Sequence, residues 1–331
     1  MFSLRLISAR NPDEIQKEFT RIGVSPEGIE LMLSKGEFII VKVGNISAQA
    51  ANILKQEMLA KGGEVALGKQ LAYLGLEKGE AIIMGTKTQY RRLLDLLPRQ
   101  PFGLSVLAQD LNRLLLALDQ RPSPLTIKNH CFDWGKKTYI MGIINITPDS
   151  FSGDGLYGQE QLIDKVLRQA EEFLAAGADL LDIGAESTRP GATPVSEEEE
   201  KQRLLPVLEV LAKKTPLPIS VDTYKPTVAK AALAAGADLI NDIWGLQRDP
   251  EMVKVVAAAQ APVIIMHNKL TPDYIDLLGE VASFLRAGID LAVAHGLPRE
   301  KVIIDPGIGF GKTLADNLTL INRLDELKGL G

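Results

Sequence analysis

Short apolar runs alternate with amphipathic segments along most of the chain. A helical pattern follows each of six runs in the second half, at 138–145, 179–185, 218–222, 238–243, 262–267 and 302–305. Runs that are apolar on both faces and joined by helices are typical of parallel strands covered on both sides. Right-handed crossovers then limit the topology to an open sheet or a closed (β/α) barrel.

A repeated segment favours the barrel. Residues 175–180 and 234–239 share the sequence Ala-Ala-Gly-Ala-Asp-Leu, and Gly177 and Gly236 stand where each helix is expected to end in a left-handed residue. Equivalent turns indicate equivalent units. We therefore predict a (β/α)8-type parallel barrel with about six of its eight units present.

Two prolines indicate a boundary between domains. Pro122 and Pro124 follow the helical stretch 104–118 and cannot continue it. Upstream, apolar runs alternate with helical patterns, which predicts a small α/β domain; the runs lie at 4–7, 38–43, 64–67 and 81–84, and the helices at 48–60 and 88–97. We assign residues 1–120 to this N-terminal domain of unknown role, 121–127 to a linker, and 128–331 to the barrel domain.

The segment before the first strand of the barrel has the pattern of a hairpin. Apolar residues alternate over 125–137, around Asp133-Trp-Gly135. We expect this hairpin to cover the closed end of the barrel.

Composition narrows the class of protein. The 331 residues are 46% apolar and 24% charged, enough for two buried cores, and the net charge of −5 argues against wholesale binding to nucleic acid or anionic membranes. The single cysteine, Cys131, cannot form an internal disulfide, and no signal peptide or apolar run of membrane-spanning length is visible. We expect a cytoplasmic protein without nucleic-acid or membrane partners; a homo-oligomer stays open.

Polar residues stand at the end of every predicted strand. The carboxyl ends of barrel strands meet at one rim, where such barrels keep their chemistry. A turn or helix cap explains any single one of these residues equally well, but not all six strands together, because buried carboxylates need a ligand or metal to satisfy them. The residues are Asn145, Asp182 with Glu186, Asp222, Asn241 with Asp242, His267 and Asp305.

Two of the predicted strand-to-helix loops are long and rich in hydroxyls and glycine. They cover 147–155 and 186–193, and loops of this kind can fold over a ligand. Arg189 is a candidate for holding an anion, with an exposed loop arginine as the alternative. Ser196 with Glu199 indicates a helix capping box, so we interpret the acidic run 197–200 as a first helical turn outside the site.

These motifs closely resemble those of dihydropteroate synthase, an enzyme of the folate pathway. Four blocks carry the resemblance, in barrel order: MGIINITPDSFS at 141–152, DIGAESTRPGA at 182–192, SVDT at 220–223 with LINDI at 239–243, and IIDPGIGFGK at 303–312. The resemblance runs from about Lys128 to the end of the chain. The N-terminal domain lies outside it.

The resemblance implies condensation of 6-hydroxymethyl-7,8-dihydropterin pyrophosphate with para-aminobenzoate, giving 7,8-dihydropteroate and pyrophosphate, with Mg²⁺ as cofactor. It implies that Asn145, Asp222 and Arg189 act in catalysis and that Asn145 reaches the metal. It places the pterin ring on Asp222, Asn241 and Asp305, with Ile143, Ile243, Met266 and Phe310 lining the pocket. It places para-aminobenzoate among Phe151, Ser187, Thr188, Arg189 and Pro190. Core packing explains the two isoleucines equally well.

The sequence departs from the family pattern in two places. Ser-Gly-Asp-Gly stands at 152–155 where the family usually has Ser-Asp-Gly-Gly. The chain also stops at Gly331, whereas the family continues with a seventh strand bearing Ser-Arg-Lys and an eighth bearing Arg-x-His. We expect these residues to be the front part of a longer protein, or another chain to supply the missing strands, because six strands alone leave apolar edges open.

Two other functions stay open. A methyltetrahydrofolate–corrinoid methyltransferase also pairs a pterin with an Asp-Asn-Asp set, but it needs no Ser-Thr-Arg-Pro-Gly loop. A non-catalytic pterin-binding or scaffold protein is the alternative of a different class. Binding of pterin pyrophosphate without synthesis of dihydropteroate would distinguish it from the enzyme.

Overall fold

The structure is a computed structural model that describes residues 5, 7, 12–146, 159–186 and 195–331. The chain divides into two compact units, Met1–Leu116 and Ala117–Gly331. Among the described residues, none of the helices combines the length and the apolar character that crossing a membrane requires.

The first unit is an α/β unit with a small antiparallel sheet. Its strands pair in the order β1-β3-β2. Strands at the predicted runs 38–43, 64–67 and 81–84 are confirmed, whereas the run at 4–7 lies largely outside the described residues. The elements are α1 (Pro12–Arg21), α2 (Pro26–Gly36), β1 (Phe38–Ser47), α3 (Ala48–Leu59), β2 (Glu64–Leu67), α4 (Lys69–Ala72), β3 (Lys78–Thr86), α5 (Lys87–Leu94), η1 (Leu97–Arg99) and α6 (Leu104–Asp119).

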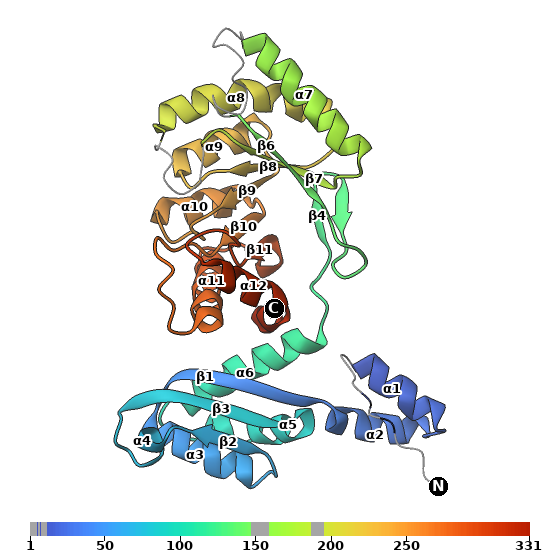
Figure 1. Cartoon of the computed structure of the whole chain (residues 1–331), viewed down its shortest axis with the longest axis vertical. Helices are drawn as coiled ribbons and strands as arrows, with labels where there is room; N and C mark the ends of the chain where they lie inside the picture. Colours follow the sequence, from blue (N-terminus) through green and yellow to red (C-terminus); the bar gives the residue numbers. More distant parts are fainter. Residues whose placement is uncertain (1–4, 6, 8–11, 147–158, 187–194) are drawn as a thin grey trace. The chain divides into compact units, whose positions relative to one another are not determined.

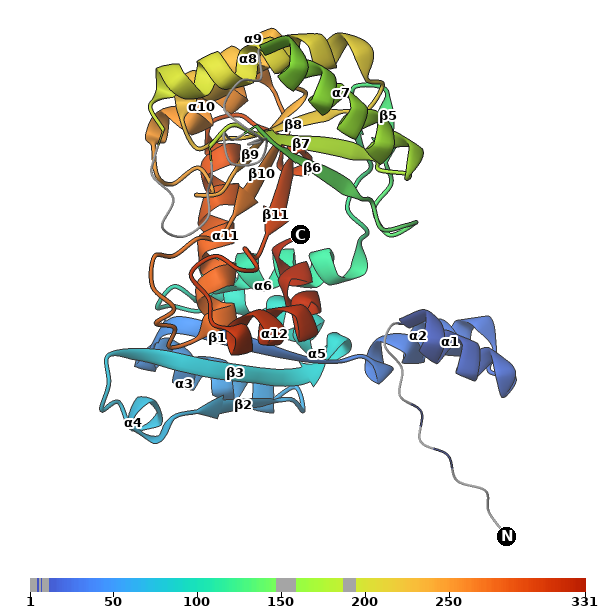
Figure 2. The same ribbon diagram turned by 45° about the horizontal axis from the view of Figure 1, so that its top comes forward.

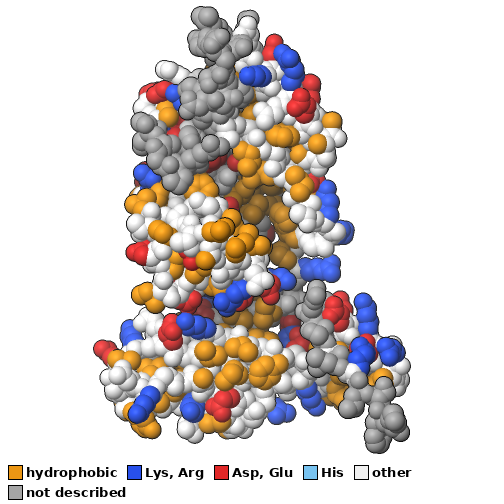
Figure 3. Space-filling view, in the orientation of Figure 1, with side chains coloured by type: hydrophobic (Ala, Val, Ile, Leu, Met, Phe, Trp, Pro, Cys, Tyr) orange, Lys and Arg blue, Asp and Glu red, His pale blue; other side chains and the backbone are white. Residues whose placement is uncertain are grey.

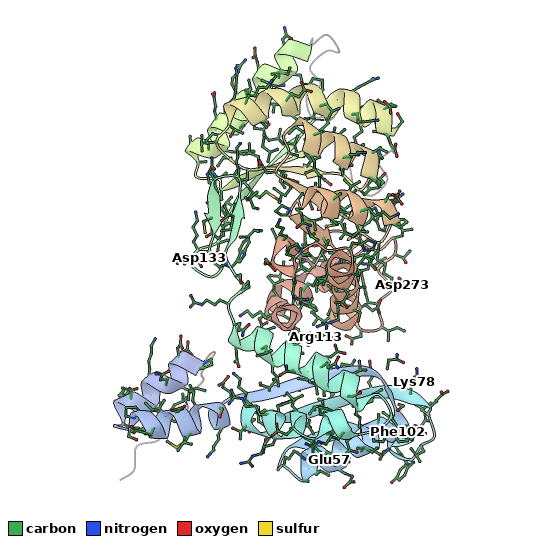
Figure 4. The ribbon with its side chains drawn as sticks, turned by 180° about the vertical axis from the view of Figure 1, so that it is seen from behind. Glu57, Lys78, Phe102, Arg113, Asp133 and Asp273 are labelled. Atoms are coloured by element: carbon green, nitrogen blue, oxygen red, sulfur yellow. The ribbon has the colours of Figure 1, made fainter. Side chains whose placement is uncertain are left out.

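The two faces of this sheet differ. Ile83 and Val65 are buried among helical residues such as Leu54 and Leu111. One of the covering helices is α3, on which Glu57, labelled in Figure 4, forms an ion pair with Lys61. Phe38, Ile40 and Ile82 on the opposite face are exposed, and hydrophobic side chains gather over this sheet in Figure 3.

The second unit contains a six-stranded parallel sheet whose strands follow one another in chain order, from β6 to β11 (Figures 1 and 2). The predicted strands are therefore confirmed, in the sequential order that successive barrel units require. The elements are β4 (Leu125–Ile127), β5 (His130–Phe132), β6 (Met141–Asn145), α7 (Gln159–Ala175), β7 (Leu180–Gly184), α8 (Glu197–Lys214), β8 (Ile219–Asp222), α9 (Pro226–Ala235), β9 (Leu239–Asp242), α10 (Pro250–Ala259), β10 (Val263–Met266), α11 (Leu277–Ala294), η3 (Arg299–Lys301), β11 (Val302–Asp305), α12 (Leu314–Asn322) and η4 (Leu324–Leu330).

Alternate residues of each strand face opposite sides of this sheet. One set packs against the helices in the main core, with Ile144, Ile183, Val221, Ile240 and Ile265 as members. The other set faces away from the helices. Its first members, near the beginning of the strands, are apolar, and polar residues follow them toward the carboxyl ends.

The predicted hairpin forms, but it turns earlier than expected. Strands β4 and β5 pair antiparallel, and the turn lies at Lys128, whose φ is 54°, not at Asp133-Trp-Gly135. Asp133, labelled in Figure 4, instead follows β5 and donates from its backbone N–H to the Tyr139 hydroxyl. A turn at Lys128 is favoured over one at Asp133-Trp-Gly135, because it connects β4 and β5 by only two residues and so lets them form an antiparallel pair.

The hairpin covers the end of the sheet that was predicted. Leu125, Ile127 and Phe132 pack on Leu180, Leu239 and Ile264, which lie at or near the beginning of their strands. The opposite, carboxyl end of the sheet is thus left for the site. The expected left-handed helix ends are also present, at Gly177 and Gly236.

Candidate active site

Strand register brings the predicted polar residues onto one face of the sheet. Asp182 on β7 lies between Ile143 on β6 and Ser220 on β8. One pleat further toward the carboxyl end, Asp222 lies between Gly184 and Asn241. These residues are on the face that points away from the helices, because Leu180 and Leu239, two residues before Asp182 and Asn241, pack on the hairpin.

Asn145 and Asp222 flank Gly184. A Cβ on Gly184 would lie 3.5 Å from Asp222 Oδ2 and 3.7 Å from Asn145 Oδ1. The glycine therefore leaves a space between an amide oxygen and a carboxylate oxygen. Asn145 is exposed toward this space and Asp222 is half-buried.

Asp182 holds the side chain of Asn241. Asn241 Nδ2 donates to Asp182 Oδ2 at 3.2 Å. Three acceptor oxygens of this group are buried and have no partner among the described residues: Asp182 Oδ1, Asp222 Oδ1 and Asn241 Oδ1. Because unpaired buried acceptors cost free energy, this arrangement suits a ligand that presents N–H donors.

The two aspartates are electrostatically unusual. Burial raises the pKa of Asp182. Burial, and next the negative charge of Asp182, raise the pKa of Asp222 well above its usual range. No ion-pair partner of either carboxylate lies in the described part of the chain. Such a pair favours a bound proton or a cationic ligand, and strongly shifted carboxylates are typical of functional sites.

Asp305 ends β11, on the far side of β10 from Asn241. Its Oδ1 accepts from the Gly307 N–H at 2.7 Å, and burial raises the pKa of its carboxyl. Gly307 has a φ of 72°, and a Cβ there would lie 2.0 Å from the His267 carbonyl oxygen. Only glycine fits this turn, which fixes where the Asp305 carboxylate lies.

Lys312 adds a cation that was quoted in the sequence motif but not predicted to act. Its Nζ donates to His267 Nδ1 and to the Phe310 carbonyl, both at 3.0 Å. Burial lowers the pKa of Lys312 to about 8 and that of His267 to about 4, so the imidazole is neutral at neutral pH. The signal in the sequence was the lysine directly after Ile-Gly-Phe-Gly.

The apolar residues expected to line the pocket differ in burial. Ile243 and Met266 are buried and belong to none of the three core clusters. Phe310 is half-buried. Ile143, on the edge strand β6, is 55% exposed. Five predicted aminobenzoate residues lie outside the described residues: Phe151, Ser187, Thr188, Arg189 and Pro190.

The acidic run 197–200 forms the first turn of α8, as predicted, but without the predicted capping box. The Ser196 hydroxyl accepts from the Glu199 N–H, as expected of an N-cap, but the Glu199 side chain pairs with Arg203 instead of completing a capping box. Glu200 is only 1% exposed and pairs with Lys225. Within this first turn, Glu200 therefore also belongs to a buried ion cluster, which the sequence did not predict.

This chain is similar to known pterin-binding enzymes in sequence and in structure. The model of the pterin-binding enzyme family matches residues 141–331. The chain is 46% identical over 220 residues to a dihydropteroate synthase of Synechocystis, a match that covers 64% of this chain and 75% of that protein. A crystal structure of Xanthomonas albilineans dihydropteroate synthase with 4-aminobenzoic acid is 45% identical, with a TM-score of 0.57, over 63% of this chain and 74% of that one.

A longer relative matches almost the whole chain. It is a probable bifunctional folylpolyglutamate synthase/dihydropteroate synthase of Halobacterium salinarum, 41% identical over 327 residues. That match covers 96% of this chain, first unit included, and the chain spans 38% of the length of that relative.

The six-stranded parallel sheet, the polar residues at the carboxyl ends of its strands and the family match together define a pterin-binding enzyme. The chain belongs to the pterin-binding enzyme family and, within it, to the dihydropteroate synthases, transferases of folate biosynthesis. The predicted family is thereby confirmed.

Proposed function

We propose that this chain condenses 6-hydroxymethyl-7,8-dihydropterin pyrophosphate with para-aminobenzoate to form 7,8-dihydropteroate and pyrophosphate. The observation that carries the proposal is the set of unpartnered, buried acceptor oxygens on Asp182, Asp222 and Asn241. The edge of a pterin ring carries an amino group and ring N–H donors. Buried acceptors discriminate strongly for such a ring, since an analogue without the donors leaves them unpaired.

The pterin ring is assigned to the space between β8, β9 and β11. Asp222 and Asn241 are directly paired across β8 and β9. Asp305 lies two strands from Asn241 and two residues further along, roughly 12 Å away at the usual strand geometry. A flat bicyclic ring can contact acceptors across that width. Ile243 and Met266 are assigned as apolar surface beside it, together with the exposed Ile143 and the half-buried Phe310.

The carboxylates also suit the reaction. Departure of pyrophosphate breaks the C–O bond of the pterin methylene group and leaves a cation that the ring delocalises. Asp222 and Asp305 stabilise that charge, because carboxylates whose pKa is raised by burial gain most from a cationic neighbour. The aniline nitrogen of para-aminobenzoate then forms the C–N bond and releases a proton.

The residues present fit a magnesium ion beside Asn145. The space next to Gly184 is bounded by Asn145 Oδ1 and Asp222 Oδ2, and hard cations prefer oxygen donors. No cluster of three acidic, histidine or cysteine residues able to hold a metal occurs in the described ranges, so oxygens of the substrate would complete the shell. When bound, Mg²⁺ would neutralise charge on the departing pyrophosphate. Asn145 is the residue of this chain that would hold it there.

The second substrate and the complete barrel are proposals from family membership. Ser187, Thr188, Arg189 and Pro190, with Phe151, are assigned to para-aminobenzoate, and Arg189 is assigned a catalytic part. The six parallel strands correspond to successive units of a (β/α)8 barrel. The cytoplasmic location and the boundaries 1–120, 121–127 and 128–331 also stay predictions.

A product assay tests the proposal. The purified chain, incubated with pterin pyrophosphate, labelled para-aminobenzoate and Mg²⁺, should form labelled dihydropteroate. Asp222→Ala should reduce the rate by about 100-fold, a usual loss when a charge-stabilising group is removed from an active site. Chelation of Mg²⁺ should also stop synthesis. Uptake of pterin pyrophosphate without Mg²⁺-dependent product would instead identify a binding protein.

A further inference from the structure

A buried lysine joins Glu186 and Val195, the described residues on either side of 187–194. Lys225 Nζ lies 2.6 Å from Glu186 Oε2, 2.6 Å from the Val195 carbonyl oxygen and 2.6 Å from Glu200 Oε2. A lysine ammonium has three N–H donors, so all three are used. Lys225, Glu186 and Glu200 are all buried.

The Glu186 carboxylate makes a second connection between the same two residues. Its Oε1 accepts from the Val195 N–H at 3.3 Å and from the Tyr224 hydroxyl at 3.2 Å. Glu186 directly precedes the segment and Val195 directly follows it. Both described neighbours are thus tied to each other and to Lys225.

Lys225 is also tied to the wall of the candidate site. It is the third residue after Asp222, and its backbone N–H donates to Thr223 Oγ1. The Thr223 N–H in turn donates to the carbonyl oxygen of Asn241. Two hydrogen bonds therefore connect Lys225, through Thr223, to Asn241, and Thr223 directly follows Asp222 in the chain.

Stability alone does not explain this cluster. Removing charges from water costs about as much as a buried ion pair returns, and apolar replacements are often equally stable. What an ammonium with three short, directed hydrogen bonds provides is a defined position for each partner. Here the partners are the flanking residues of one segment and a helix, α8, that follows it.

We propose that Lys225 is a positioning residue that holds Glu186 and Val195 together beside the pterin site and thereby sets the affinity for para-aminobenzoate. This inference rests on the proposed function, which assigns Ser187 to Pro190 to that substrate. Lys225 itself touches neither substrate in this account. It acts through Glu186 and Val195.

The test compares Lys225→Met with Lys225→Arg by steady-state kinetics. Because Lys225→Met leaves two carboxylates close together without their cation, the double variant Lys225→Met/Glu200→Gln, which removes one of those charges, is measured beside it. Both Met variants should raise KM for para-aminobenzoate about tenfold, as misplaced binding groups do, with KM for pterin pyrophosphate unchanged. Lys225→Arg, which keeps the charge, should recover part of the loss. Lys254→Met, which removes an exposed lysine paired with Glu251 on α10, is the matched control.

Amide hydrogen exchange gives a readout that does not depend on activity. Loss of the cluster should speed exchange of the Val195 N–H in both Met variants, with strands β8 and β9 unchanged. Equal changes in the two KM values, or unchanged exchange at Val195, would overturn the positioning role. If the unmodified chain makes no dihydropteroate, the proposed function fails, and exchange at Val195 still decides the role of Lys225.

Discussion

Asn241 donates a hydrogen bond from Nδ2 to Asp182 Oδ2 at 3.2 Å, and this contact decides which end of the amide faces the site. With the NH₂ group held by Asp182, the Oδ1 acceptor is the atom left unpartnered. Asp182 thus acts on the site in two ways: it orients Asn241, and its own Oδ1 is an unpartnered acceptor. The sequence showed Asp182 at a strand, but only the register of β7, β8 and β9 shows what it holds.

Asp182→Asn should weaken binding of pterin pyrophosphate by at least about tenfold, the usual cost of leaving a buried polar group with the wrong partner. The new amide can donate to Asn241, and this allows the Asn241 side chain to turn its NH₂ group toward the ligand. The variant should unfold at the same or a higher temperature, because burial raises the pKa of Asp182 and so disfavours its charged form. Calorimetric titration and thermal unfolding measure the two effects.

Asp242→Asn is the matched control for that experiment. Asp242 is the next residue after Asn241, but its carboxylate accepts from the backbone N–H groups of Trp244 and Leu246 instead of contributing to the site. Its affinity for pterin pyrophosphate should stay within about twofold of the unmodified chain. Equal losses in the two variants would show that Asp182 has no special connection with Asn241.

Gly307→Ala should destabilise the second unit and weaken pterin binding together. A Cβ at this position would lie 2.0 Å from the His267 carbonyl oxygen, in a left-handed turn with a φ of 72°. A clash with backbone in such a turn costs about 2–4 kcal/mol, measured as a lower free energy of unfolding in urea. The turn also carries the N–H that holds Asp305.

Gly309→Ala is the control that distinguishes the clash of Gly307→Ala with His267 from the backbone strain of any left-handed alanine. Gly309 has a similar φ of 87°, but a Cβ there would have no atom within 4 Å. Its cost should be only about 1–2 kcal/mol, that of a left-handed alanine. If the two variants are equally stable, the close approach of Gly307 to His267 is not present in the protein.

His267→Gln should make folding less sensitive to acid between pH 4 and pH 6.5. Burial lowers the pKa of His267 from its usual 6.5 to about 4, so the unfolded chain binds a proton in this window that the native protein does not. The native state therefore loses stability as the pH falls toward 4, and the variant lacks this loss. Gln keeps an acceptor for Lys312.

The effect of His267 is the difference between variant and unmodified chain in how the free energy of unfolding changes with pH. The difference is needed because other groups titrate in the same window. Burial raises the pKa of Asp242 to about 6, which makes its contribution opposite in sign. Urea unfolding at pH 7 and pH 4.5 gives the required differences. A pH dependence of His267→Gln equal to that of the unmodified chain would contradict the assignment to His267.

The strands of the second unit were predictable because their burial is two-sided. Runs such as 179–185 and 262–267 agree with β7 and β10 to within a residue at each end, since apolar stretches bounded by glycine or polar residues have few other solutions. The hairpin was predicted with the wrong turn. Its alternation extends past β5, and only the left-handed Lys128 distinguishes the true turn from Asp133-Trp-Gly135.

The site was predictable at the level of residues that end strands. Asn145, Asp222 and Asn241 follow from parallel topology, because the carboxyl ends of the strands share one rim. The contacts of Glu200 and Lys225 did not follow, since they join α8 to the segment before α9 and depend on how the helices pack. The same holds for Lys312 and His267, which are 45 residues apart in the chain.

The central claim is that acidic and amide side chains from separate parallel strands surround one pterin ring. Calorimetric titration of the whole chain with pterin pyrophosphate tests it most directly, in the unmodified chain and in Asp222→Asn, Asn241→Ala and Asp305→Asn. Each variant should bind at least about tenfold more weakly, while Asp290→Asn, at an exposed position on α11, should bind normally. Unchanged affinity in all three site variants would contradict the account.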